Sequence, residues 1–157
     1  MLQILKNSLG SIISKFIAEI KANIYIGDGN LPYHIGGRYF AIEDLIELDQ
    51  QKIHPAVLFH ELIHWSGHVD RIHRPSLYSF HTPDRMIEEA LAEYGAHIMC
   101  NTFSINPGYD INNHPYIRDL QYHPAQRFQS RELHEYIIKH GTEAAQFLFD
   151  LYNKSVL

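Results

Sequence analysis

Cysteine and basic charge are both scarce in this chain of 157 residues. The one cysteine, Cys100, cannot form an internal disulfide or build a cysteine-based zinc site, so we expect a reducing, cytoplasmic setting. The formal net charge of −5 provides no basic field that would draw the protein onto nucleic acid. No apolar run is long enough to span a bilayer, and Lys15 interrupts the apolar N-terminal segment, so neither a membrane span nor a signal peptide is predicted.

The hydrophobic pattern predicts one α+β domain. The length suits a single core, and 45% of the residues are apolar, as in soluble globular proteins. Residues 1–22 predict a helix packed on the core; a helix lying on a membrane surface is the alternative, although its polar face has few Lys and Arg. The other expected elements are a small, mostly antiparallel β region at 23–48 with a hairpin turn near Glu43 and Asp44, helices at 54–66 and 83–101, and helices within 115–154 that Gly141 separates.

Histidine is abundant, with twelve in the chain. His60 and His64 flank Glu61 in the spacing His-Glu-x-x-His, inside the helix predicted at 54–66. Residues four apart on a helix lie about 40° apart around its axis, so both imidazoles can bind one ion. Glu61 then lies where a carboxylate can take the proton of a metal-bound water. The motif predicts a zinc-dependent hydrolase; a chance string of this kind arises in about one chain in twenty of this composition.

A second helix offers a further carboxylate ligand. Glu89 and Glu93 lie four residues apart on one face of the helix predicted at 83–101. The run from Glu89 to Glu93 resembles the Glu-x-x-x-Asp pattern of gluzincins, with Glu in place of the final Asp. That resemblance implies Glu89 as the third ligand and Glu93 as the acceptor for a ligand histidine N–H. Without the upstream histidines, Glu88, Glu89 and Glu93 would be interpreted as a solvated acidic face.

The loop after the first of these helices offers competing residues. The string from His60 to Asp70 also resembles the metzincin-like pattern His-Glu-x-x-His-x-x-Gly-x-x-Asp, in which Asp70 would be the third ligand. Donors to the oxyanion of a tetrahedral intermediate are expected among nearby polar side chains, with an ordinary loop or core role as the alternative for each. These candidates are His68, Arg71, His73 and Arg74 in the loop and Tyr94 and His97 on the second helix. The histidines at 34, 54, 81, 114, 123, 134 and 140 show no ligand spacing and are interpreted as surface residues.

Longer strings match a known family. The runs Leu58–His68 and Glu88–Ala96, with Arg71 and Arg74 between them, resemble the zincin metallopeptidase domain of ArdC-type antirestriction proteins of plasmids and phages. Weaker similarity extends over residues 38–153. The resemblance implies a zincin-like fold, one zinc ion and a bacterial host cell. Full-length ArdC-type proteins also carry an N-terminal single-stranded-DNA-binding domain that has no counterpart in this sequence, so their DNA binding is not carried over.

Together the patterns predict a zinc-dependent metallopeptidase that hydrolyses a peptide or protein substrate. One Zn²⁺ would be bound by His60, His64 and Glu89, with Glu61 as the general base. Two alternatives stay open. The metal could be purely structural, in a module that binds a partner protein of an anti-defence system, and a closed fourth coordination position would favour that role. A single-stranded-DNA-associated antirestriction role would require salt-sensitive DNA binding.

Overall fold

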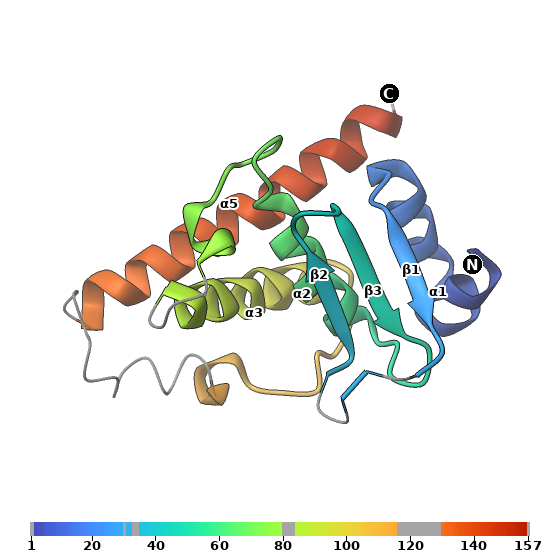
Figure 1. Ribbon diagram of the computed structural model, residues 1–157, viewed down its shortest axis with the longest axis horizontal. Coiled ribbons are helices and arrows are strands. Elements are labelled where there is room, and N and C mark those ends of the chain that lie inside the picture. The colour runs from blue at the N-terminus through green and yellow to red at the C-terminus, as the bar shows by residue number, and fades with distance from the viewer. Residues whose placement is uncertain (1, 30, 33–34, 80–83, 116–129, 157) are drawn as a thin grey trace.

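The computed structural model describes residues 2–29, 31–32, 35–79, 84–115 and 130–156. Within these residues a three-stranded sheet lies against a layer of helices (Figure 1). The strands follow the order β1-β3-β2, with β1 and β3 parallel and β2 and β3 antiparallel. The α+β class is confirmed, and the sheet is mixed where the sequence predicts a mostly antiparallel one. The strands are β1 (Ile24–Gly27), β2 (Gly37–Phe40) and β3 (Leu45–Asp49).

The β2–β3 hairpin puts β2 at the edge of the sheet. Residues 41–44 form the turn, and Asp44 has a positive φ of 48°, which Asp adopts more readily than most residues. The hydroxyl of Tyr39 donates to Asp44 Oδ1 at 2.7 Å and closes the hairpin. The turn therefore lies where the sequence predicts it, and one side of β2 stays free of strand pairing within the described sheet.

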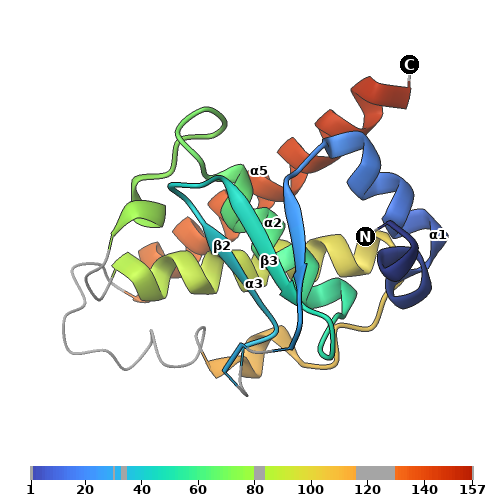
Figure 2. The ribbon, with the colours of Figure 1, turned by 45° about the vertical axis from the view of Figure 1, so that its right-hand side comes forward.

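The helices pack together on one side of the sheet, with α1 on the β1 side (Figures 1 and 2). The bounds of the first three helices agree with the predicted ranges 1–22, 54–66 and 83–101 to within two residues. Residue 83 and residues 116–129, which belong to predicted helical ranges, lie outside the described residues. None of the described helices has the length and apolar character needed to cross a bilayer. The elements are α1 (Leu2–Ile20), α2 (Pro55–Ser66), α3 (Asp84–Thr102) and α5 (Ser130–Val156), with short 3-10 turns η1 (Pro75–Tyr78) and η2 (Ile111–Asn113).

The helix α5 is continuous through Gly141, so the predicted helix break there is wrong. A Cβ atom at Gly141 would lie 3.1 Å from the Leu91 carbonyl oxygen and 3.2 Å from the Gly95 backbone nitrogen. The glycine is needed because α5 crosses α3 at backbone contact distance, and not because the helix ends. The Thr142 hydroxyl donates to the Ile138 carbonyl oxygen one turn earlier within the same helix.

Helix α2 lies at the centre of the core. Its side chains Leu58, Phe59, Leu62 and Ile63 have no exposed surface, and the helix contacts β2, β3, α3 and α5. Each such side chain contributes about 1.5–3 kcal/mol through burial. Phe16 of α1 packs edge-on against Phe59 with ring centroids 6.1 Å apart, so the apolar face of α1 is buried in the core. The rigid packing of α2 fixes the direction in which its polar residues point.

Candidate metal centre

The two histidines of α2 and a glutamate of α3 converge on one point. His54 and Pro55 start α2: the His54 side chain accepts a hydrogen bond from the Ala56 backbone N–H, and Pro55 occupies the first turn. One turn further on, His60 and His64 project toward α3, which packs along α2. A ligand atom from each of His60, His64 and Glu89 lies within 4.8 Å of the others.

The distances in this cluster fit a single cation. The Nε2 atoms of His60 and His64 are 3.0 Å apart, and Glu89 Oε2 lies 3.2 Å from the first and 3.7 Å from the second. Three ligands at zinc-like bond lengths in tetrahedral arrangement are separated by about 3.3 Å, the middle of this range. Two imidazoles and one carboxylate are a ligand set that divalent ions such as zinc accept, and Arg85 and Arg74 pair with Glu89 and Glu88 at the edge of the cluster. We conclude that the residues present fit a divalent metal.

His60 occupies the side of the cluster that faces the cleft. Its Nδ1 lies 3.0 Å from Glu93 Oε1, and both side chains are 14% exposed. Burial alone lowers the pKa of His60, but the Glu89 and Glu93 carboxylates outweigh it and raise that pKa well above its ordinary value. His114 Nε2 lies 3.6 Å from the same Glu93 oxygen, and the His114 ring packs on Tyr109 with centroids 4.8 Å apart.

His64 occupies the core side. Its Nδ1 lies 3.2 Å from Glu88 Oε1, and the Glu88 side chain has no exposed surface. Glu88 also receives two hydrogen bonds from Arg74 and one from Ser76. Burial alone raises the Glu88 pKa, but the hydrogen bonds from His64 and Arg74 and the charge of Arg74 hold it far below its ordinary value. Glu88 is therefore a buried carboxylate.

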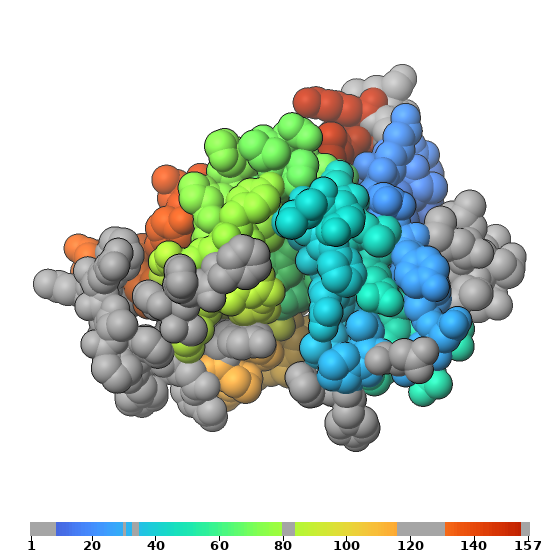
Figure 3. Space-filling view, in the orientation of Figure 1, coloured from blue at the N-terminus to red at the C-terminus, as the bar shows by residue number. Residues whose placement is uncertain are grey.

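A cleft of about 670 Å³ opens onto the cluster between β2 and α3. Figure 3 shows the surfaces of these two elements side by side on the viewed face. Glu61 lines the cleft together with His60, His64 and Glu89, and burial raises its pKa. A Cβ atom at Gly37 of β2 would lie 2.9 Å from Glu61 Cγ, so this glycine allows the edge strand to approach Glu61.

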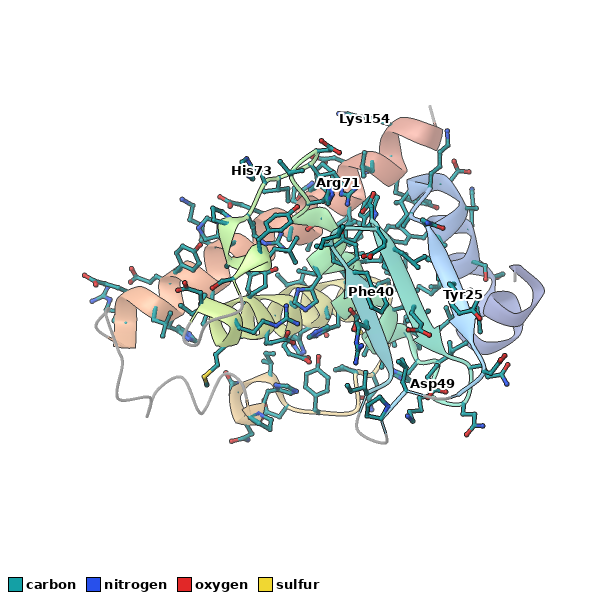
Figure 4. The ribbon with its side chains drawn as sticks, viewed as in Figure 1. Tyr25, Phe40, Asp49, Arg71, His73 and Lys154 are labelled. Carbon is teal, nitrogen blue, oxygen red and sulfur yellow. The ribbon has the colours of Figure 1, made fainter. Side chains whose placement is uncertain are left out.

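The side chains proposed as competing or accessory groups lie elsewhere. Asp70, the rival ligand, is 81% exposed and does not belong to the cluster formed by the described residues. Arg71 stacks on Trp65, with its guanidinium carbon 3.9 Å from the ring centroid, and forms an ion pair with Asp44 at the hairpin turn. Figure 4 shows Arg71 and His73 in the loop beyond the strand ends.

The predicted oxyanion donors lie outside the described lining of the cleft. Among the described residues that line the cleft, His68, Arg71, Tyr94 and His97 do not appear. His68 accepts from the Asp70 backbone N–H, and Tyr94 packs against the crossing of α3 and α5. The loop turns away from the cleft after α2. Tyr94 lies on another face of α3 than Glu93, and His97 lies one turn beyond Glu93, past the end of the cleft lining.

Several functional side chains escape sequence reasoning. Glu88, for which the sequence suggests no role other than a solvated acidic face, is buried behind His64, and Arg74, a candidate oxyanion donor, is buried with it. Tyr109 and His114 line the cleft from the segment around η2, although His114 is interpreted from the sequence as a surface residue. The only feature of the sequence that indicates different surroundings for Glu88 and Glu89 is that they are neighbours, because two adjacent residues on a helix point in different directions. The position of a loop residue such as Tyr109 has no periodic signal at all.

Comparisons with known proteins agree with this fold. Residues 11–123 match a family model described as a zincin-like metallopeptidase, which confirms the predicted zincin-like fold. Two crystal structures of the antirestriction ArdC protein from the R388 plasmid are similar, the Mn(II)-bound form with a TM-score of 0.62 and the metal-free form with 0.61. Each is 23% identical over 92% of this chain, which spans about half of their length, 51% and 50% respectively. No curated protein sequence matches the chain.

Proposed function

Because the chain belongs to the zincin-like metallopeptidase family, we propose that it hydrolyses peptide bonds at the cluster of His60, His64 and Glu89. The observation that carries this proposal is the convergence of three ligand atoms beside the Glu61 carboxyl in one cleft. A fold alone is a weak guide to activity, whereas a ligand set with an adjacent base is specific to a type of chemistry. The substrate we propose is a peptide or protein.

Zinc is the ion we propose for the site. Two imidazoles and one carboxylate form the usual ligand set of zinc hydrolases, which leaves a fourth position for the reaction. The similar R388 protein holds Mn(II) in its crystal structure, and borderline ligands of this kind accept several divalent ions. When bound, the metal supplies Lewis-acid chemistry, which lowers the pKa of a water and polarises a carbonyl group.

Glu61 acts as the general base in this proposal. Its carboxylate takes a proton from the attacking water and, once protonated, returns it to the leaving amine. Burial raises its pKa, which improves both transfers because the group then titrates nearer to neutral pH. The edge strand β2 lines the same cleft, so an extended substrate can pair with its free side as an added strand.

Tyr109 and His114 are the donors to the oxyanion that we propose from the structure. Both line the cleft on the α3 side, across from β2. Burial and the nearby Glu93 carboxylate raise the pKa of Tyr109, so its hydroxyl stays protonated and can donate a hydrogen bond. Burial lowers the pKa of His114, which favours the neutral imidazole at pH 7.

The substitution Glu61→Gln tests this function. Purified protein loaded with Zn²⁺ is assayed on a quenched-fluorescent peptide library, and bound metal is quantified in the same sample. The variant should keep its metal and lose about 10²–10⁴-fold in rate, because the amide cannot accept the proton. Glu135→Gln is the matched control, since Glu135 is 61% exposed on α5 and pairs with Arg131. Unchanged turnover in Glu61→Gln would refute the role of Glu61.

A second candidate keeps the metal and omits hydrolysis. The observation that favours it is the structural similarity to an antirestriction protein. A metal-stabilised module that binds a partner protein should protect DNA from restriction equally well with Glu61→Gln, and should lose protection with His64→Ala. A third candidate, a role associated with single-stranded DNA, predicts that the protein shifts the gel mobility of single-stranded DNA and that this shift weakens steeply with salt. Loss of protection in Glu61→Gln would favour the peptidase instead.

A further inference from the structure

Glu88 and Arg74 form a buried ion pair directly behind the metal cluster. Their side chains are 0% and 4% exposed. Arg74 Nη2 donates to Glu88 Oε1 at 2.7 Å, and Arg74 Nε donates to Glu88 Oε2 at 3.3 Å. Ser76 donates to Oε2 at 2.5 Å. Removing two charges from water is costly unless their hydrogen-bonding capacity is filled, and here the surrounding groups fill it.

This pair ties the end of α2 to α3. The Arg74 guanidinium also donates to the Ile63 carbonyl at 2.6 Å and to Ser66 Oγ at 3.0 Å, on either side of His64 in the sequence. The loop is shaped around this side chain, because a Cβ atom at Gly67 would lie 2.7 Å from the guanidinium carbon. The helix that carries the histidines and the helix that carries the glutamates are therefore held by one cation.

We propose that Arg74 and Glu88 are positioning residues that orient His64 toward the metal. Glu88 Oε1 accepts the His64 Nδ1–H at 3.2 Å, which leaves the Nε2 lone pair directed at Glu89 and His60. Two hydrogen bonds from Arg74 and one from Ser76 hold the Glu88 carboxyl in place, so the imidazole ring that it contacts is fixed in one orientation. The inference rests on one part of the proposed function, namely that the cluster binds a metal. The two positioning residues themselves lie outside the cleft.

Zinc affinity distinguishes positioning from simple stabilisation of the fold. Wild type, Glu88→Gln, Arg74→Lys and the control Arg71→Lys are titrated with Zn²⁺ in competition with a chromophoric chelator. We expect Glu88→Gln to weaken zinc binding about 10–100-fold and Arg74→Lys to weaken it by a smaller factor. Arg71→Lys, in the same loop but paired with Asp44, should bind zinc like wild type. Co²⁺ absorption spectra should shift in the first two variants alone.

Wild-type zinc affinity in both Glu88→Gln and Arg74→Lys would overturn the proposal, because a purely structural ion pair changes stability and not affinity. A second measurement needs no variant. Long-range ¹H–¹⁵N spectra of metal-free wild type should show His64 protonated at Nδ1, with that proton exchanging slowly because it is buried. His64 protonated at Nε2 alone would also overturn it.

The same measurements separate this inference from the proposed function. Wild type that binds zinc and cleaves no peptide would refute the peptidase, while the affinity ratios would still decide whether Glu88 positions His64. Wild type that binds no divalent metal would refute both. Full activity with unaltered zinc affinity in both Glu88→Gln and Arg74→Lys would refute the positioning role and leave the peptidase intact.

Discussion

The two halves of the metal cluster use the same pairing in different surroundings. In the cleft half, His60 faces Glu93 at 3.0 Å, and both are 14% exposed. In the core half, His64 faces Glu88 at 3.2 Å, and they are 3% and 0% exposed. Among the described residues no arginine pairs with Glu93, whereas Arg74 pairs with Glu88 and Arg85 pairs with the ligand Glu89. Solvent and the neighbouring imidazoles are enough to stabilise the charge of a partly exposed carboxylate, whereas a fully buried carboxylate needs its own cation.

This difference assigns different tasks to the two halves. The core half holds one imidazole in a single orientation through packing and charge. The cleft half borders Tyr109 and His114 and can respond to a bound substrate. A rigid support behind a site and adaptable groups in front of it are what precise positioning of a reaction requires.

The largest effect should come from removing the cation of the core half. Arg74→Met leaves the Glu88 carboxylate buried and uncompensated, so the free energy of unfolding should fall by about 3–5 kcal/mol. Glu93→Gln removes the carboxylate of the cleft half, whose side chain is 14% exposed, and should cost less than Arg74→Met because it leaves no buried charge without a partner. Urea unfolding of the metal-free proteins measures both. Equal losses would mean that the two halves do not differ in the way that burial implies.

Two glycines sharpen the comparison. Gly67→Ala pushes a Cβ atom into the Arg74 guanidinium and should cost about 1–3 kcal/mol of stability, with weakened zinc binding. Gly37→Ala pushes against Glu61 and should lower peptide hydrolysis while zinc binding is retained. Unfolding, zinc titration and peptidase assays on both variants provide the check. Zinc affinity lost only in Gly37→Ala would reverse the assignment of the two halves.

The smallest effect concerns pH. Burial alone raises the Glu93 pKa, but its contact with His60 outweighs this and lowers it. A carboxylate with a lowered folded pKa stabilises the protein above its unfolded pKa, 4.5 here, and this contribution is lost as the pH falls through the folded value. The stability difference between wild type and Glu93→Gln should therefore shrink as the pH falls below 4.5. A difference that grows on acidification would contradict this sign.

Local periodicity made part of the fold and site predictable. The helices α2 and α3, the hairpin turn and the α+β class all follow from spacing that acts within a few residues. The prediction that His60 and His64 share one helical face rests on the same kind of local spacing. Gly141 shows the limit: the same residue serves a helix end or a close helix crossing, and only the position of α3 decides between them.

The amino-acid sequence by itself determined which residues are able to bind a metal and on which helices they lie, because a helix converts sequence spacing into direction. Only the tertiary structure decided that Glu88 and Arg74 are buried behind His64 while Tyr109 reaches the cleft. Burial and contact between distant segments depend on how whole helices and loops pack, and no local pattern encodes that packing. The sequence shows where each glutamate lies in the chain, but it does not show the environment that determines the role of its charge.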